Sequence, residues 1–354
     1  MRKRILIGVA GIFYYSGLVA LARWWNRRTG RRLMILTYHR AMGGNLRQHL
    51  LYLRRHYRIL HVEAALEELY AGRKSGQRSS DTRTPLILTF DDGYRDNYTH
   101  GFALARELMV PLTIYLVPGY IESGENFWWV ESERIVKRAQ VREVEVEGRT
   151  YHLDNAEERT ALSVLLDVRS RHAHSIAERE SFLAEVREKL AVPATVLEEE
   201  TPAMPLTWEQ VREMDASGWI SFGAHTLNHP ILAAISDPME LRQQIAECYT
   251  GLEQHLGRPV RSFAYPIGQM QHISDEVLCT VREAGYKWAV TTNYGYNTPA
   301  DNPYLLKRAE ADIDQHWLVV AAEAAGLWGF VARLRWIPFI RKNFTNSKRQ
   351  VADV

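Results

Sequence analysis

The sequence predicts an α/β fold whose mainly parallel sheet is closed, or partly closed, into a barrel. Short apolar segments alternate with segments of helical periodicity, which is typical of parallel strands joined by helices. The apolar segments lack regular polar and apolar alternation, which indicates strands buried on both faces. No G-x-G-x-x-G motif opens a predicted helix, so nothing favours a dinucleotide-binding fold.

Six apolar segments are predicted to be the strands of this sheet. Each is short and is bounded by polar or turn-forming residues. They are residues 33–38, 86–90, 113–117, 219–223, 262–265 and 288–292. Because helical segments separate them, we expect neighbouring strands to run in the same direction.

Three of the intervening helices have clear start and stop signals. Pro follows one N-cap directly, at Pro238, and Gln210 completes a capping box at another. A glycine stands where each helical pattern stops, as is common after a helix C-terminus. The N-caps and their stop residues are Thr207 and Gly218, Asp237 and Gly257, and Ser274 and Gly285.

Residues from about 122 to 205 interrupt the alternation of strands and helices. This stretch is highly charged and mostly helical, with a short hairpin predicted at residues 141–153. We interpret it as an insertion between two strands of the barrel, which spans residues 33–315. Residues 316–354 follow as a separate apolar segment and basic tail, in which Trp and Arg alternate. That pattern suits a helix at a membrane interface and equally a helix packed on the core.

The first 32 residues form an N-terminal segment that we expect to associate with a membrane. An apolar run at residues 5–22 is just long enough to span a bilayer and has basic residues at both ends. The arginines after the run disfavour export of the rest of the chain, so the catalytic domain is predicted to be cytoplasmic at the inner membrane. Two alternatives are an exported protein with an N-terminal anchor or cleaved signal, and a buried core helix.

Composition excludes several classes of protein. The 354 residues carry a net charge of only +2, so nothing global argues for a nucleic-acid partner. There are 2 cysteines, Cys248 and Cys279, too few for a disulfide framework or a cysteine zinc site. We expect both to be inert structural thiols.

Two pairs of polar residues follow two of the predicted strands. Asp91 and Asp92 come directly after residues 86–90, and Gly93 permits a tight turn there. His225 and His229 follow the strand at 219–223, at a spacing that lets both present nitrogens to one cation. In barrel enzymes, the catalytic residues lie at the carboxyl ends of the strands. Two imidazoles and one carboxylate would hold a divalent metal and leave the second carboxylate free as a base.

These segments resemble a known family. The order of TFDDG at residues 89–93, H-T-L-N-H at 225–229 and FAYPIG at 263–268 is similar to that of the NodB-type polysaccharide deacetylases, carbohydrate esterase family 4. The resemblance implies a distorted (β/α) barrel, here with a helical insertion. It also implies that Asp91 is the general base and that Asp92, His225 and His229 bind the metal, with zinc as the default.

The chain departs from the family pattern at two places. Many members have an arginine at the position of Ala264, where it orients the base; Arg308 is our candidate replacement. The resemblance further implies that the backbone N–H of Tyr265 helps to hold the oxyanion. No C-terminal catalytic histidine is evident, and His39 is instead predicted to be the general acid. In the poly-β-1,6-N-acetylglucosamine deacetylases, a Tyr-His motif near the N-terminus supplies the general acid. The order of motifs in this chain resembles theirs.

The predicted activity is therefore metal-dependent hydrolysis of the N-acetyl group of an amino sugar in a polysaccharide or glycan. One alternative is a deacylase of a lipid-linked sugar precursor at the membrane. Another is a catalytically inactive, membrane-docked glycan-binding protein, which the missing arginine alone favours. O-deacetylation would need the same site. An N-acetylated glycan or lipid-linked sugar is the expected substrate, and a membrane surface is the expected partner.

Overall fold

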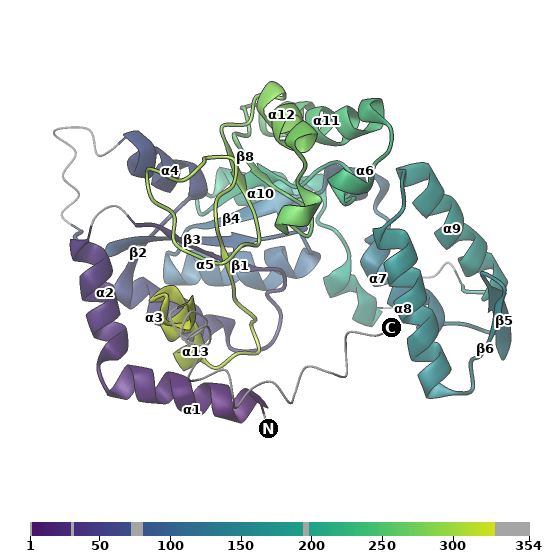
Figure 1. Ribbon diagram of the computed structural model, residues 1–354, viewed down its shortest axis with the longest axis horizontal. Coiled ribbons are helices and arrows are strands. Elements are labelled where there is room, and N and C mark those ends of the chain that lie inside the picture. The colour runs from purple at the N-terminus through teal and green to yellow at the C-terminus, as the bar shows by residue number, and fades with distance from the viewer. Residues whose placement is uncertain (1, 30–31, 72–80, 194–197, 330–354) are drawn as a thin grey trace, which may run out of the picture.

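A parallel eight-stranded sheet forms the centre of the protein in the computed structural model (Figure 1). The structure describes residues 2–29, 32–71, 81–193 and 198–329. The strand order is β10-β1-β3-β4-β7-β8-β9, and β2 also pairs with β3. The strands are β1 (Met34–Tyr38), β2 (Tyr57–Leu60), β3 (Thr84–Phe90), β4 (Leu112–Leu116), β7 (Ile220–Ala224), β8 (Ser262–Ala264), β9 (Trp288–Val290) and β10 (Ala309–Glu310).

The two edges of this sheet are joined by one short segment of chain. Leu306 makes a parallel bridge to Val290 at the end of β9. A few residues later, β10 pairs with β1, where Leu36 is opposite Ala309. Residues 306–310 therefore lie between β9 and β1, and the sheet curls into the distorted (β/α) barrel that the sequence predicted.

Helices connect the strands and cover the sheet. All six predicted strands are present with ends within two residues of the prediction, whereas β2 and β10 were not predicted. The helices are α1 (Arg2–Tyr15), α2 (Leu18–Arg28), α3 (Leu46–His56), α4 (Val62–Ala71), α5 (Ala103–Leu108), α6 (Pro118–Ser123), α7 (Trp128–Lys137), α8 (Ala156–Arg171), α9 (Ile176–Lys189), α10 (Trp208–Ala216), α11 (Pro238–Leu256), α12 (Asp275–Glu283) and α13 (Trp317–Ala324). Short helical turns are η1 (Asn97–Phe102), η2 (Glu198–Ala203), η3 (Leu232–Ala234) and η4 (Met270–His272).

The predicted caps are present at α10, α11 and α12. Thr207 and Gln210 form the capping box, and the Asp237 side chain accepts a hydrogen bond from the Met239 N–H. Ser274 caps α12 in the same way. Gly257, at φ 65°, takes the left-handed conformation after α11 that a residue with a side chain rarely adopts.

The insertion forms a body of its own beside the barrel, shown at the right of Figure 1. It contains α7, α8, α9 and the predicted hairpin, here β5 (Glu143–Val146) paired antiparallel with β6 (Arg149–His152). Its apolar side chains form a core separate from that of the barrel. This second core also includes Tyr94, Val117 and Tyr120, so it joins the insertion to the barrel.

The N-terminal segment is two helices rather than one. Gly17, at φ 82°, separates α1 from α2, and the two helix axes are bent by 65°. Within the described residues, no single helix is long and apolar enough to cross a membrane, although this bent pair together meets the length and composition of a span. Ala10 of α1 packs in one cluster with Leu318 and Val319 of α13.

The described part of the C-terminal segment is a buried helix, and the two cysteines differ in exposure. Trp317 starts α13, whose residues 318–322 are buried, so this part of the C-terminal segment packs on the protein. The rest of that segment, from residue 330, lies outside the described residues. Both cysteines are free thiols; Cys248 is buried, whereas Cys279 is exposed on α12.

Candidate active site

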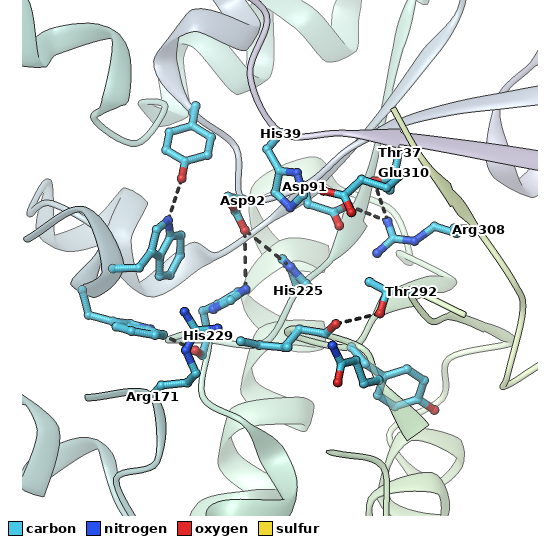
Figure 2. A pocket seen from close by; sticks show the side chains of 16 residues that line it. Thr37, His39, Asp91, Asp92, Arg171, His225, His229, Thr292, Arg308 and Glu310 are labelled. Atoms are coloured by element: carbon cyan, nitrogen blue, oxygen red, sulfur yellow. Dashed lines mark hydrogen bonds and ion pairs between the residues drawn. The ribbon is translucent and has the colours of Figure 1, made fainter. Parts of the chain in front are cut away.

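The two polar pairs meet at one end of the barrel, around a cavity of about 360 Å³ (Figure 2). Asp91 and Asp92 follow β3, and His225 and His229 follow β7, as predicted. Both pairs come from the carboxyl ends of parallel strands, which lie at the same end of the sheet. The cavity is lined by Thr37, His39, Asp91, Asp92, Tyr94, Trp128, Trp129, Arg171, His225, His229, Tyr265, Ile267, Gln269, Thr292, Arg308 and Glu310.

The two acids point in different directions because the strand ends between them. The Asp91 N–H still donates to the Tyr38 carbonyl (2.9 Å), whereas Asp92 has a left-handed backbone, at φ 75°. Gly93 follows at φ 76°, and a Cβ there would lie 2.8 Å from Leu116. Only glycine fits at this turn without displacing its neighbour, so the turn that separates the two carboxylates depends on it.

Asp92, His225 and His229 form a compact group of potential metal ligands. The Asp92 Oδ1 lies 3.5 Å from the Nε2 atom of each histidine. One oxygen and two nitrogens thus lie within 4.8 Å of one another in a buried position. Tetrahedral ligands at the usual zinc distances are about 3.4 Å apart, so this spacing fits one shared ion.

The electrostatics of Asp92 and His229 also fit a cation. The Asp92 Oδ1 is buried and has no hydrogen-bond partner among the described residues. Burial, followed by the charge of His225, lowers the pKa of His229 to about 3. Burial alone would raise the pKa of Asp92, but the neighbouring imidazoles bring it below its usual value. A carboxylate and a neutral imidazole are the forms that bind a metal.

His225 is held by the backbone of the next strand. Its Nδ1 lies 2.7 Å from the carbonyl oxygen of Ala264, at the end of β8. We assign the proton to Nδ1, which donates to this carbonyl and leaves the Nε2 lone pair directed at Asp92. Ala264 therefore contributes through its backbone, at the position where the family pattern has an arginine.

Asp91 is paired with a buried arginine from the closing segment of the barrel. Arg308 Nη1 donates to Asp91 Oδ1 (2.7 Å) and to Thr37 Oγ1 (3.0 Å), and Arg308 Nε donates to the Thr291 carbonyl (2.9 Å). Burial alone would raise the pKa of Asp91, but the charges of Arg308 and then His225 outweigh it and lower that pKa well below its usual range. Asp91 is therefore a carboxylate held in one orientation.

The two remaining predicted site residues line the same cavity in different ways. His39 is an exposed residue just past β1, beside Asp91 and Asp92 in Figure 2. Tyr265 is buried, and its backbone N–H donates to the Val290 carbonyl (3.2 Å). The sheet thus uses this N–H, which differs from the expectation of a free oxyanion donor.

Several residues at the cavity were not predicted. Three of them, Trp128, Trp129 and Arg171, come from the insertion and line the cavity. The Trp129 ring centroid lies 4.3 Å from that of His229. A Trp-Trp pair and one arginine within a charged helical stretch have no local feature that separates them from packing and surface residues, so sequence patterns missed them.

Comparison with known proteins gives one family match. A model described as polysaccharide deacetylase matches residues 78–179 and 182–289. No curated protein matches the chain.

Among solved structures, several deacetylases have the same fold. Streptococcus pyogenes deacetylase PplD in complex with acetate is 18% identical, with 84% of this chain and 99% of that chain covered and a TM-score of 0.54. IcaB from Ammonifex degensii is 21% identical, with 84% and 98% covered and a TM-score of 0.51. The BpsB deacetylase domain from Bordetella bronchiseptica is 16% identical, with 80% and 97% covered and a TM-score of 0.51.

Proposed function

The chain belongs to the polysaccharide deacetylase family, and is a hydrolase of non-peptide carbon–nitrogen bonds; we propose that its substrate is the N-acetyl group of an amino sugar in a glycan. One observation carries this proposal. The Asp91–Arg308 pair and the Asp92, His225 and His229 group open onto the same cavity. A base and a metal site side by side are what the attack of water on an amide requires.

The residues of this site have separate tasks in the proposed reaction. A divalent ion, zinc by default, would be held by Asp92, His225 and His229 and would acidify water and polarise the amide carbonyl. Asp91 accepts the proton of the attacking water, while Arg308 keeps Asp91 ionised and oriented. His39 then donates a proton to the sugar nitrogen as the carbon–nitrogen bond breaks. The products are acetate and a free amino sugar.

Removal of the metal is expected to abolish acetate release. A chelator-treated enzyme retains Asp91 and His39 but loses the ion that acidifies the water, and restoring one equivalent of zinc should restore the rate. The measurement is acetate release from a panel of N-acetylated glycans, free and lipid-linked, with O-acetylated glycans in parallel. Full activity of enzyme shown to be metal-free would contradict the metal assignment, and release from O-acetyl groups alone would contradict the N-acetyl assignment.

A lipid-linked sugar is a second candidate substrate, and one feature favours it. α1 and α2 each bury one side and expose large apolar residues on the other. On α1, Ile12 and Tyr15 are 66% and 78% exposed, while Ala10, on the opposite side of the helix, is buried. The exposed apolar residues of the two helices are Ile5, Leu6, Ile12, Tyr15, Leu18, Leu21, Trp24 and Trp25.

We therefore propose that these helices lie on an anionic membrane surface. Because α1 packs on α13, it can place its exposed side among lipids without leaving the protein. Lys3, Arg4, Arg27 and Arg28 flank the apolar residues and would meet acidic headgroups. The same basic flanks support a position on the cytoplasmic face of the inner membrane.

Binding to vesicles tests this proposal. The protein is expected to sediment with vesicles that contain phosphatidylglycerol, and less with pure phosphatidylcholine. An Ile12→Glu, Trp25→Glu double variant should stay in solution, because two buried charges would oppose insertion. Met239→Glu, at a 75% exposed site on α11, is the matched control and should sediment like the wild type. Equal sedimentation of the double variant would contradict the proposed surface.

A further inference from the structure

The two histidines of the proposed metal site are supported unequally. The Nδ1 of His225 is fixed by the Ala264 carbonyl, as is usual for a metal-binding histidine. The Nδ1 of His229 is buried and has no hydrogen-bond partner among the described residues. Something other than a ring hydrogen bond must therefore set the orientation of the His229 imidazole.

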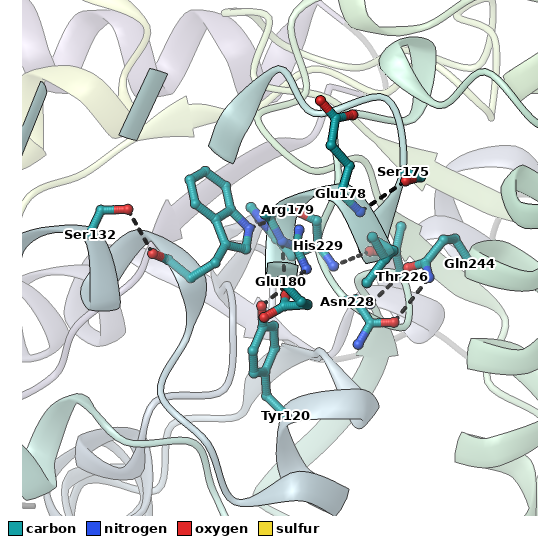
Figure 3. A network of polar contacts seen from close by, with 12 residues as sticks. Tyr120, Ser132, Ser175, Glu178, Arg179, Glu180, Thr226, Asn228, His229 and Gln244 are labelled. Carbon is teal, nitrogen blue, oxygen red and sulfur yellow. Dashed lines mark hydrogen bonds and ion pairs between the residues drawn. The ribbon is translucent and has the colours of Figure 1, made fainter. Parts of the chain in front are cut away.

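The backbone of His229 needs support as well. His229 has φ 55° and Thr226 has φ 63°, a left-handed conformation that residues with side chains rarely adopt. The barrel holds the loop from one side. Thr226 Oγ1 accepts from the His229 N–H (2.9 Å), and the side chain of Gln244 on α11 accepts from the Asn228 backbone N–H and donates to the Asn228 side chain (Figure 3). These contacts leave the carbonyl of His229 to be satisfied from elsewhere.

The insertion supplies that partner. Trp128, the first residue of α7, donates from Nε1 to the His229 carbonyl oxygen (3.1 Å). The ring of Trp129 lies against the His229 imidazole, 4.3 Å between centroids, and its own Nε1 donates to the Tyr94 hydroxyl (2.6 Å). The backbone and the ring of one proposed metal ligand are thus both contacted by adjacent tryptophans of the insertion.

Trp128 is fixed in turn by the folding of the insertion. Its side chain is buried in the second hydrophobic core, which consists mostly of residues of the insertion, including those of α7, α8 and α9. The buried guanidinium of Arg179, on α9, lies 5.6 Å from the Trp128 ring and donates to Tyr120 and Glu180 (Figure 3). A shift of the insertion relative to the barrel would therefore move the donor away from His229.

We propose that Trp128 and Trp129 are positioning residues for His229, and that docking of the insertion and binding of a metal stabilise each other. The inference rests on the metal site of the proposed function. Linkage requires the effect to be reciprocal: a docked insertion raises metal affinity, and a bound metal favours the docked insertion. The insertion would then complete the metal site as well as line the cavity.

Metal affinity of matched tryptophan variants tests the inference. Trp128→Phe keeps an aromatic ring in the insertion core but removes the donor to His229, and we expect the Kd for zinc, measured by chelator competition, to rise about 10–100-fold. Trp129→Ala removes the ring that lies against His229, and it should also raise the Kd for zinc. Trp208→Phe is the control, because Trp208 is also a buried tryptophan whose Nε1 donates to a side chain, that of Glu122, away from the cavity.

A second readout separates positioning from general stability. In the wild type, zinc is expected to slow hydrogen exchange in α7, α8 and α9, and Trp128→Phe should reduce that protection. A purely structural role would lower the Tm of apo and zinc-bound protein equally and leave the zinc Kd unchanged, which would overturn the inference. Absence of zinc binding by the wild type would overturn it as well. Zinc-loaded wild type that releases no acetate would instead refute the proposed function alone.

Discussion

Asp91→Asn is expected to lower kcat/KM for acetate release by about 10²–10⁴-fold, the usual contribution of a general base. The substitution replaces one carboxylate oxygen with an amide nitrogen and leaves the shape of the side chain unchanged. The new amide side chain cannot accept a proton from water. Its carbonyl oxygen can still accept from Arg308, so the geometry around the cavity should persist.

The low pKa of Asp91 makes this loss insensitive to moderate changes of pH. Because the charges of Arg308 and His225 together outweigh the effect of burial on its pKa, Asp91 is ionised throughout the neutral range. The ratio of wild-type to variant kcat/KM should therefore stay constant across the neutral range, because neither the ionised Asp91 nor the asparagine that replaces it titrates there. If the wild-type rate changed near neutral pH because Asp91 became protonated, the charge of Arg308 could not be acting on Asp91.

The control for this variant is its metal content. Asp92, His225 and His229 form the proposed metal site, so Asp91→Asn is expected to bind one equivalent of zinc, the same as is expected of the wild type. Asp92→Asn, by contrast, should lose both zinc and activity. Wild-type turnover by Asp91→Asn would show that another residue is the base, and loss of zinc from it would show that Asp91 is a ligand.

The sequence was sufficient for the parts of the site that depend directly on strands. Asp91, Asp92, His225 and His229 each lie within a few residues of a strand end, and parallel strands bring those ends together. The Gly93 turn was also predictable, because an Asp-Asp-Gly sequence after an apolar strand indicates a sharp reversal. Local pattern and sheet direction together therefore predicted four residues of the cavity and the turn that arranges two of them.

Other parts depend on long-range packing that no local pattern encodes. β10 has two residues, and β2 contains Arg58 and is mostly only partly buried, so neither forms an apolar run that a sequence pattern can detect. The absence of an arginine at Ala264 suggests Arg308 as the replacement, but the position of Arg308 results from the way residues 306–310 join β9 to β1. Trp128 reaches His229 only because the insertion folds back onto the barrel. The N–H of Tyr265 was assigned from a motif, and the sheet pairing that engages it was not visible in that motif.

Arg308→Ala is expected to destabilise the fold by about 3–5 kcal/mol, because it leaves a buried carboxylate without its partner. Arg308 is 1% exposed and Asp91 is 3% exposed, so water cannot replace the lost guanidinium at little cost. Thr37 and the Thr291 carbonyl also lose a donor. The free energy of unfolding, measured with urea on the metal-free protein, tests this without any contribution from metal binding.

A double-mutant cycle distinguishes the ion pair from loss of packing. Asp91→Asn removes the charge that Arg308 neutralises, so adding it to Arg308→Ala should recover part of the stability that the single variant loses. Arg308→Lys is the matched variant for geometry: it retains a positive charge, but a lysine cannot donate to Asp91, Thr37 and the Thr291 carbonyl from one planar group. We expect it to be more stable than Arg308→Ala and still slower than the wild type in acetate release. If the changes in the free energy of unfolding caused by the two substitutions were additive, Arg308 would stabilise the fold by packing alone. Other residues would then have to orient Asp91.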